Sequence, residues 1–296
     1  MTSAAADAEA VSIGAHGEYS VLPGVIDRHV HLGLSSLDEL RDSAVVEVHD
    51  LGWEPTALAH WLAHPPEGLS VSVSGRFHTA PGGYPSGRVW APEASVRAVH
   101  NTEDARLAVA EAVAAGSNAI KITLHTELPL LADAELRALV AAAHAAGLPA
   151  IVHAEGPGQV QRAIAAGANA LAHTPWTELL DDATVQAASG MTWISTLAIH
   201  EGADLERALE NARRFIAAGG QLHYGTDMGN GATPSGGVNA REIELLGQVG
   251  LSGQELIIAV CGSERLIPRH RALHAPLPLP ETAAELIDWL QQAKRC

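Results

Sequence analysis

Short apolar runs alternate with Ala-rich amphipathic segments along most of the chain. The apolar runs predict eight strands, at 20–31, 43–50, 68–79, 118–125, 149–155, 169–174, 191–197 and 221–227. The segments between them space their apolar side chains as a helix does, and most of them end at a glycine. Strands that are connected through helices lie parallel and are joined by right-handed crossovers. The alternation therefore predicts an α/β fold.

The number of units indicates which α/β fold this is. Eight strand and helix units within about 245 residues are typical of a (β/α)8 TIM barrel. A doubly wound open sheet is the alternative, and it would gather ligands only at its switch point. We predict a single-domain barrel over 20–265, with an N-terminal extension at 1–19 and a C-terminal linker and helix at 266–296.

The composition excludes several classes of protein. Lys and Arg total 18 against 34 Asp and Glu, which gives a net charge of -16 and disfavours nucleic acid as a partner. The start of the chain lacks a signal-peptide pattern, and no apolar run approaches the roughly 20 residues that cross a bilayer. Neither Cys261 nor Cys296 has a metal-binding spacing. We expect a cytoplasmic protein with a small-molecule substrate and no membrane partner, and we leave a homo-oligomer open.

Six residues with metal-ligand chemistry each lie near the end of a predicted strand. They are His29, His31, Lys121, His153, His173 and Asp227. Parallel strands of a barrel end at one face, and residues i and i+2 of a strand point the same way. Singly, each histidine has an alternative as a core or surface residue, and the aspartate as an Asx turn or helix cap. Their shared placement favours one metal site.

Lys121 needs a separate explanation, because an ammonium group is costly to bury. One alternative is a salt bridge with a buried acid. The other is reaction of the amine with carbon dioxide, giving an anionic carbamate that bridges two cations. The second alternative turns a buried positive charge into an oxygen ligand.

The segment PGVIDRHVH resembles the PGxIDxHxH opening of the metal-dependent amidohydrolase superfamily. The later Lys, His, His and Asp match its binuclear pattern in order, and the resemblance covers roughly residues 20–265. It implies that His29, His31 and Asp227 bind the more buried ion, that His153 and His173 bind the more exposed one, and that N6-carboxylated Lys121 bridges them. Many members carry an accessory β-sandwich built from both termini, and this chain is expected to lack most of it.

The expected cofactors are two divalent ions. Zn²⁺ is favoured, and Mn²⁺, Fe²⁺ or Co²⁺ also suit these ligands. Such a centre supplies hydroxide at neutral pH, and Asp227 is expected to carry the proton to the leaving group. This chemistry predicts hydrolysis of an amide, cyclic amide or ester of a small molecule. Alternatives are a cyclase or dehydratase that forms a heterocycle at the same site, and a non-catalytic metal-dependent binding protein.

Substrate contacts are expected from the loops at 78–93 and 228–237 and from polar or aromatic residues after other strands. The candidates are His78, Tyr84, Arg88, Trp90, His125, Trp176 and His200. For most of them a packing or surface role is an equal alternative. Arg88 would suit a substrate carboxylate and the tryptophans an aromatic ring. Asp27 shares the strand face of His29, where it either supports the strand or orients a ligand.

Overall fold

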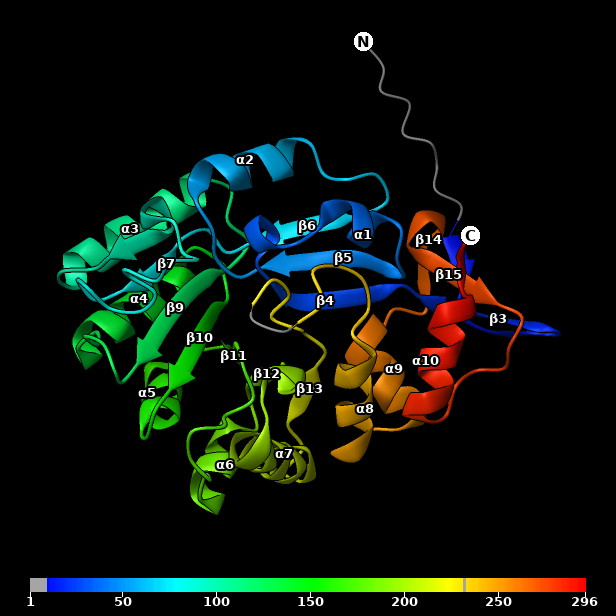
Figure 1. The fold of residues 1–296 in the computed structure, drawn as a ribbon. Coiled ribbons are helices and arrows are strands. Elements are labelled where there is room, and N and C mark those ends of the chain that lie inside the picture. Colours follow the sequence, from blue (N-terminus) through cyan, green and yellow to red (C-terminus); the bar gives the residue numbers. More distant parts are fainter. Residues whose placement is uncertain (1–9, 231–232) are drawn as a thin grey trace, which may run out of the picture.

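Two parallel sheets form the centre of the molecule (Figure 1). The computed structural model describes residues 10–230 and 233–296. The first sheet has the order β4-β5-β6, with strands β4 (Val25–Val30), β5 (Val45–Asp50) and β6 (Ser70–Val73). The second has the order β13-β12-β11-β10-β9-β7-β8, with strands β7 (Phe77–Thr79), β8 (Val96–Ala98), β9 (Ile120–His125), β10 (Ala150–Glu155), β11 (Ala170–Leu171), β12 (Thr192–Ile194) and β13 (Gln221–His223).

Backbone hydrogen bonds connect the two sheets at both borders. On one side, the His31 amide donates to the Met228 carbonyl (3.0 Å), beyond the end of β13. On the other side, the Asn118 amide donates to the Val73 carbonyl (2.7 Å), which links the start of β9 to β6. The predicted strands thus follow one another around a TIM-barrel-like α/β arrangement.

Helices cover the outer side of these strands (Figure 1). They are α1 (Leu37–Arg41), α2 (Pro55–Ala63), α3 (Thr102–Ala114), α4 (Asp133–Ala145), α5 (Gln159–Ala166), α6 (Asp182–Ala188), α7 (Gly202–Ala217), α8 (Ala240–Gln248) and α9 (Gly253–Cys261). Local signals set their ends: the Asn101 side chain accepts hydrogen bonds from the first turn of α3. The main apolar core lies between the helices and the strands. Within it, the stacked rings of Trp193 and Phe215, with centres 3.8 Å apart, connect β12 to α7. Among the described residues, no helix is both long and apolar enough to cross a membrane.

The third predicted strand, 68–79, is broken into two in the structure. Gly75, between β6 and β7, has a φ of +77°, a conformation that interrupts an extended strand. As a result β6 pairs with β5, whereas β7 pairs with β9 and with β8. Residues 96–98 lie in none of the eight predicted strands, so β8 is an addition to the predicted set.

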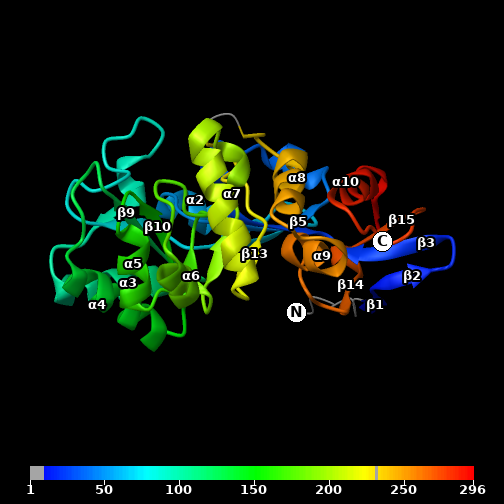
Figure 2. The same cartoon turned by 90° about the horizontal axis from the view of Figure 1, so that it is seen from below.

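Residues from both ends of the chain form a separate antiparallel structure beside α9 (Figure 2). It contains β1 (Ala10–Ser12), β2 (Gly14–His16), β3 (Tyr19–Pro23), β14 (Leu266–Pro268), β15 (Ala272–Ala275) and β16 (Lys294–Arg295), together with α10 (Ala283–Gln292). The predicted strand 20–31 is therefore two strands, β3 and the already described β4, which are separated at Gly24. No side chain fits at this position, because a Cβ would lie 2.2 Å from Val46 Cγ1.

These terminal strands correct the expectation of a tail made only of linker and helix. The final helix is present as α10, but β15 precedes it and pairs with β3 over four residue pairs, from Ala272 with Pro23 to Ala275 with Ser20. The chain thus carries more accessory β-structure than its sequence suggested. Residues 1–9 of the predicted extension and residues 231–232 of the predicted loop lie outside the described residues, and the predicted domain limits stay a prediction.

Candidate metal centre

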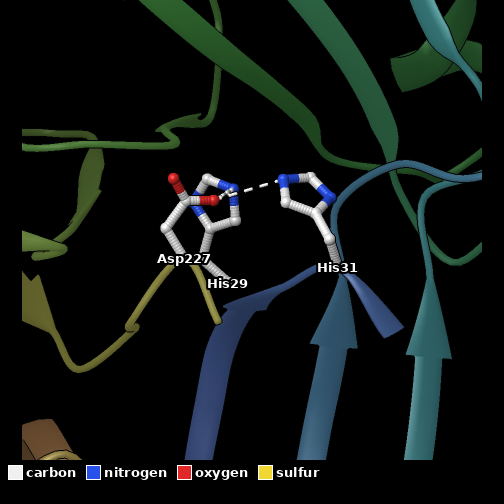
Figure 3. A group of neighbouring side chains, drawn as sticks. All are labelled: His29, His31 and Asp227. Carbon is white, nitrogen blue, oxygen red and sulfur yellow. Dashed lines mark ion pairs between the residues drawn. The ribbon is translucent and has the colours of Figure 1, made fainter. Parts of the chain in front are cut away.

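Three of the six predicted ligands meet at the exit of β4. His29 and His31 come from this strand and its end, and Asp227 comes from the segment after β13 (Figure 3). The Nε2 atoms of His29 and His31 lie 3.1 and 3.2 Å from the same oxygen, Asp227 Oδ1. All three side chains are buried. The side chains predicted to hold the more buried ion are therefore in contact with one another.

The hydrogen bonds of the two imidazoles define which nitrogen is available. His29 Nδ1 lies 2.7 Å from the Ala172 carbonyl, and His31 Nδ1 lies 3.1 Å from the Gly52 carbonyl. A carbonyl only accepts hydrogen bonds, so each Nδ1 carries a proton and a neutral ring keeps its lone pair at Nε2. Asp227 Oδ1 is buried and has no hydrogen-bond partner among the described residues. Three ligand atoms with free electron pairs thus face one point, which is the arrangement that a divalent cation needs.

Burial and mutual contact favour the protonation states of metal ligands. Burial lowers the pKa of His29 well below its usual value, and nearby Lys121 lowers it further. Burial alone would raise the pKa of Asp227, but this pKa lies well below its usual range, because any protonated ring among His29, His31 and His173 would stabilise the carboxylate. Neutral imidazole and ionised carboxylate are the forms that bind metal.

A second carboxylate fixes the backbone that presents Asp227. Asp27 Oδ1 accepts hydrogen bonds from the amides of His29 and Thr226 (both 3.1 Å), and Asp27 Oδ2 accepts one from the Thr226 hydroxyl (2.6 Å). These hydrogen bonds tie β4 to the segment that follows β13, which is the structural role considered for Asp27, whereas its role in orienting a ligand stays a prediction. Gly225 allows the close approach, because a Cβ there would lie 3.1 Å from His29 Cβ.

Lys121 extends from β9 into the same site. Its side chain is 1% exposed, and its Nζ lies 3.5 Å from His29 Nε2. Within the described part of the chain the amine forms no ion pair, so the salt bridge considered from the sequence is not seen. Burial lowers the pKa of the amine to about 7. A large share of the amine is then uncharged at neutral pH, and the uncharged amine is the form that reacts with carbon dioxide.

His173 and His153 complete the predicted set on the other side of the site. The His29 and His173 ring centres are 4.6 Å apart, and those of His153 and His173 are 4.9 Å apart. His173 Nδ1 is hydrogen-bonded to the Thr196 hydroxyl (2.8 Å), which leaves its Nε2 free. His153 is bonded the other way round, through Nε2, and keeps Nδ1 free.

The partner of His153 is Glu155, a residue that the sequence analysis did not single out. Glu155 Oε2 lies 3.0 Å from His153 Nε2 and 2.6 Å from His125 Nδ1. These three residues form a second group whose ligand atoms lie within 4.8 Å of one another. The signal was present as His-Ala-Glu at the end of β10, because i and i+2 share a strand face there just as His29 and His31 do. Orientation of a metal-binding histidine by a carboxylate is a common role for such a residue.

A cavity of about 90 Å³ opens onto the predicted ligands. Its remaining lining includes the aromatic residues Phe77, Tyr84, Trp90 and Trp176, together with Leu34, Thr123, Glu155, Ile199 and Asn230. Of the predicted substrate contacts, Tyr84, Trp90 and Trp176 thus line the cavity, and His125 stacks on Tyr84 at 4.9 Å.

The other three candidates lie away from this cavity. His78 bonds the Lys121 carbonyl through Nδ1 (2.9 Å), and burial lowers its pKa to about 4. Arg88 extends over the Tyr84 ring toward Glu127, 3.9 Å away. His200 packs against Trp176 with ring centres 4.7 Å apart. Contact of any of these side chains with a substrate stays a prediction.

Comparison with solved structures places the chain among proteins of one fold. An amidohydrolase crystal structure matches with a TM-score of 0.70 at 20% identity, over 90% of this chain and 82% of that one. A putative prolidase from Bifidobacterium longum gives 0.67 at 24% identity, over 88% and 76%. A Xaa-Pro dipeptidase with methionine in its active site gives 0.70 at 17%, over 93% and 84%. No family model and no curated protein matches the sequence. The predicted resemblance to amidohydrolases is confirmed at the level of the fold.

Proposed function

We propose that the protein is a binuclear metal-dependent hydrolase that cleaves an amide bond of a small molecule. The observation that carries this proposal is the convergence of His29 Nε2 and His31 Nε2 on Asp227 Oδ1, a buried oxygen that finds no hydrogen-bond partner within residues 10–230 and 233–296. The solved structures of similar fold support it, because they include prolidases and a phenylurea hydrolase, which act on C–N bonds.

Under this proposal the six predicted ligands divide between two ions. His29, His31 and Asp227 would hold one ion, His153 Nδ1 and His173 Nε2 the other, and carboxylated Lys121 would bridge them. Two divalent ions, most simply Zn²⁺, would lower the pKa of a shared water and polarise the scissile carbonyl. Asp227 would accept the proton of the attacking water and return it to the leaving nitrogen. The aromatic wall at Tyr84 and Trp176 would exclude solvent from the acyl group.

The alternatives from the sequence gain less support. A cyclase would use the same residues, but the similar solved structures include a Xaa-Pro dipeptidase, a phenylurea hydrolase and a molinate hydrolase, which favour hydrolysis. An ester substrate is compatible with the same chemistry. The cytoplasmic location and the small-molecule partner remain predictions.

Metal analysis of protein purified without added metal tests the proposal directly. We expect two ions per chain, an added mass of carbon dioxide on Lys121, and hydrolysis within a panel of dipeptides, aryl amides and aryl ureas. His31→Asn should lose metal and activity together. His144→Asn is the matched control, because His144 is exposed on α4 and bonded to Asn169. Fewer than one ion per chain, or equal metal loss in both variants, would contradict the proposal.

A further inference from the structure

The turn that follows β12 holds a threonine in an unfavourable backbone conformation. Thr196 has a φ of +41°, a left-handed value that a β-branched residue rarely adopts. The Thr196 amide donates to the Gly225 carbonyl (3.0 Å), and the Thr196 hydroxyl lies 2.8 Å from His173 Nδ1. A strained residue in contact with a candidate metal ligand needs a surrounding structure that holds it in place.

Glu242, in the first turn of α8, supplies that support. Its Oε1 accepts a hydrogen bond from the Leu197 amide (3.0 Å), and its Oε2 accepts one from the Ala198 amide (2.7 Å). The side chain is fully buried, which is rare for an acid that has no partner. Both carboxylate oxygens thus bind the two peptide groups that directly follow Thr196.

We infer that Glu242 is a positioning residue for His173, which it orients through the Thr196 turn. By holding the Leu197 and Ala198 amides, Glu242 keeps Thr196 left-handed and its hydroxyl on His173 Nδ1. A threonine hydroxyl can donate or accept, and we assign it here as the acceptor, so that His173 is protonated at Nδ1 and presents Nε2 to the site. The part of this inference that concerns metal rests on the proposed function, whereas the part that concerns the tautomer of His173 does not.

The tautomer is measured in chelator-treated protein from the ¹⁵N chemical shifts of the histidine rings. The wild-type protein should show His173 protonated at Nδ1. Thr196→Val removes the hydroxyl while keeping the shape, and Glu242→Gln removes one of the two strong acceptors. Both variants should shift His173 toward protonation at Nε2. An unchanged Nδ1-protonated ring in both folded variants would overturn the inference.

Zn²⁺ binding, measured by competition with a chelator, supplies the second readout. Loss of an orienting partner typically weakens metal binding about 10- to 100-fold, so the second Zn²⁺ should bind more weakly in both variants by that factor. The first Zn²⁺, on His29, His31 and Asp227, should keep its affinity. A second Zn²⁺ bound with unchanged affinity in both variants would overturn the inference.

Two matched variants separate orientation from general loss of packing. Thr174→Val removes a buried hydroxyl that follows His173 in sequence but has no hydrogen-bond partner. Glu244→Gln removes an exposed carboxylate from the same helix as Glu242. Neither should change the tautomer or the affinity for the second Zn²⁺. Equal effects of Thr174→Val and Thr196→Val would overturn the inference.

The two readouts also separate this inference from the proposed function. A tautomer change in a protein that binds no Zn²⁺ would support the orienting role of Glu242 and contradict the binuclear hydrolase. Two Zn²⁺ ions in every variant with an unchanged tautomer would support the hydrolase and overturn the orienting role.

Discussion

Replacing Gly225 with alanine tests whether close contact between β12, β4 and the segment after β13 builds the site. An added Cβ would lie 2.3 Å from Ile194 Cγ2 and 3.1 Å from His29 Cβ. The first distance is more than 1 Å shorter than a carbon–carbon van der Waals contact of about 3.5–4.0 Å. Ile194 is 3% exposed and packed in the core, so the backbone must move instead. Overpacking of this kind costs about 1–3 kcal/mol of unfolding free energy.

The functional effect should exceed the effect on stability. Gly225 lies two residues before Asp227, so a backbone shift of that size displaces the carboxylate from His29 and His31. A misplacement of about 1 Å costs roughly 100-fold in rate. We therefore expect Gly225→Ala to unfold at lower urea concentration, to bind metal more weakly, and to lose about 100-fold in kcat/KM on a substrate of the wild-type enzyme.

Gly190→Ala serves as the control, because nothing lies within 4 Å of a Cβ at that exposed position. It should alter neither stability nor metal binding by a measurable amount. Wild-type stability and activity in Gly225→Ala, or losses of equal size in both variants, would refute the reasoning.

Three further predictions concern the acids and the metal. Asp227→Asn should lower kcat about 1000-fold, because the amide cannot carry a proton; a near-normal kcat would contradict the proposed role. A chelator should lower the midpoint of thermal unfolding, and added Zn²⁺ should restore it. An ion present at about 100 times its Kd adds roughly 2.7 kcal/mol to the unfolding free energy. Burial raises the pKa of Glu242 from 4.5 to about 7, so its contribution to stability is present below pH 4.5 and is lost as pH rises through 7. The unfolding free energy of Glu242→Gln, measured in urea at each pH, should therefore rise relative to that of the wild type between pH 5 and 8, by up to about 3 kcal/mol. A difference between the two proteins that does not change with pH would contradict this.

The sequence predicted the arrangement of the ligands because each signal is local. An apolar strand that ends in a histidine, lysine or aspartate can be recognised within a few residues, and parallel strands bring such ends together. His29, His31 and Asp227 meet for that reason. Glu155 could have been found in the same way, since its spacing from His153 repeats that of His29 and His31.

Other features depend on contacts that no local pattern encodes. The free nitrogen of His29 is determined by the Ala172 carbonyl, which is 143 positions away in the sequence. The break at Gly75 and the pairing of β8 depend on which neighbours the third strand finds. The terminal strands are only two to five residues long, too short for an alternating pattern to stand out.

The pairing of β3 with β15 links the site to the order in which the chain is made. β15 lies about 250 residues after β3, and β3 leads through Gly24 directly into β4, which carries His29. The sheet edge that anchors β4 is thus completed by a segment that leaves the ribosome after all six predicted ligands. Contacts of such long sequence separation form late and slowly. A nascent chain stalled before β15 would therefore carry all six predicted ligands while β4 lacks this anchor.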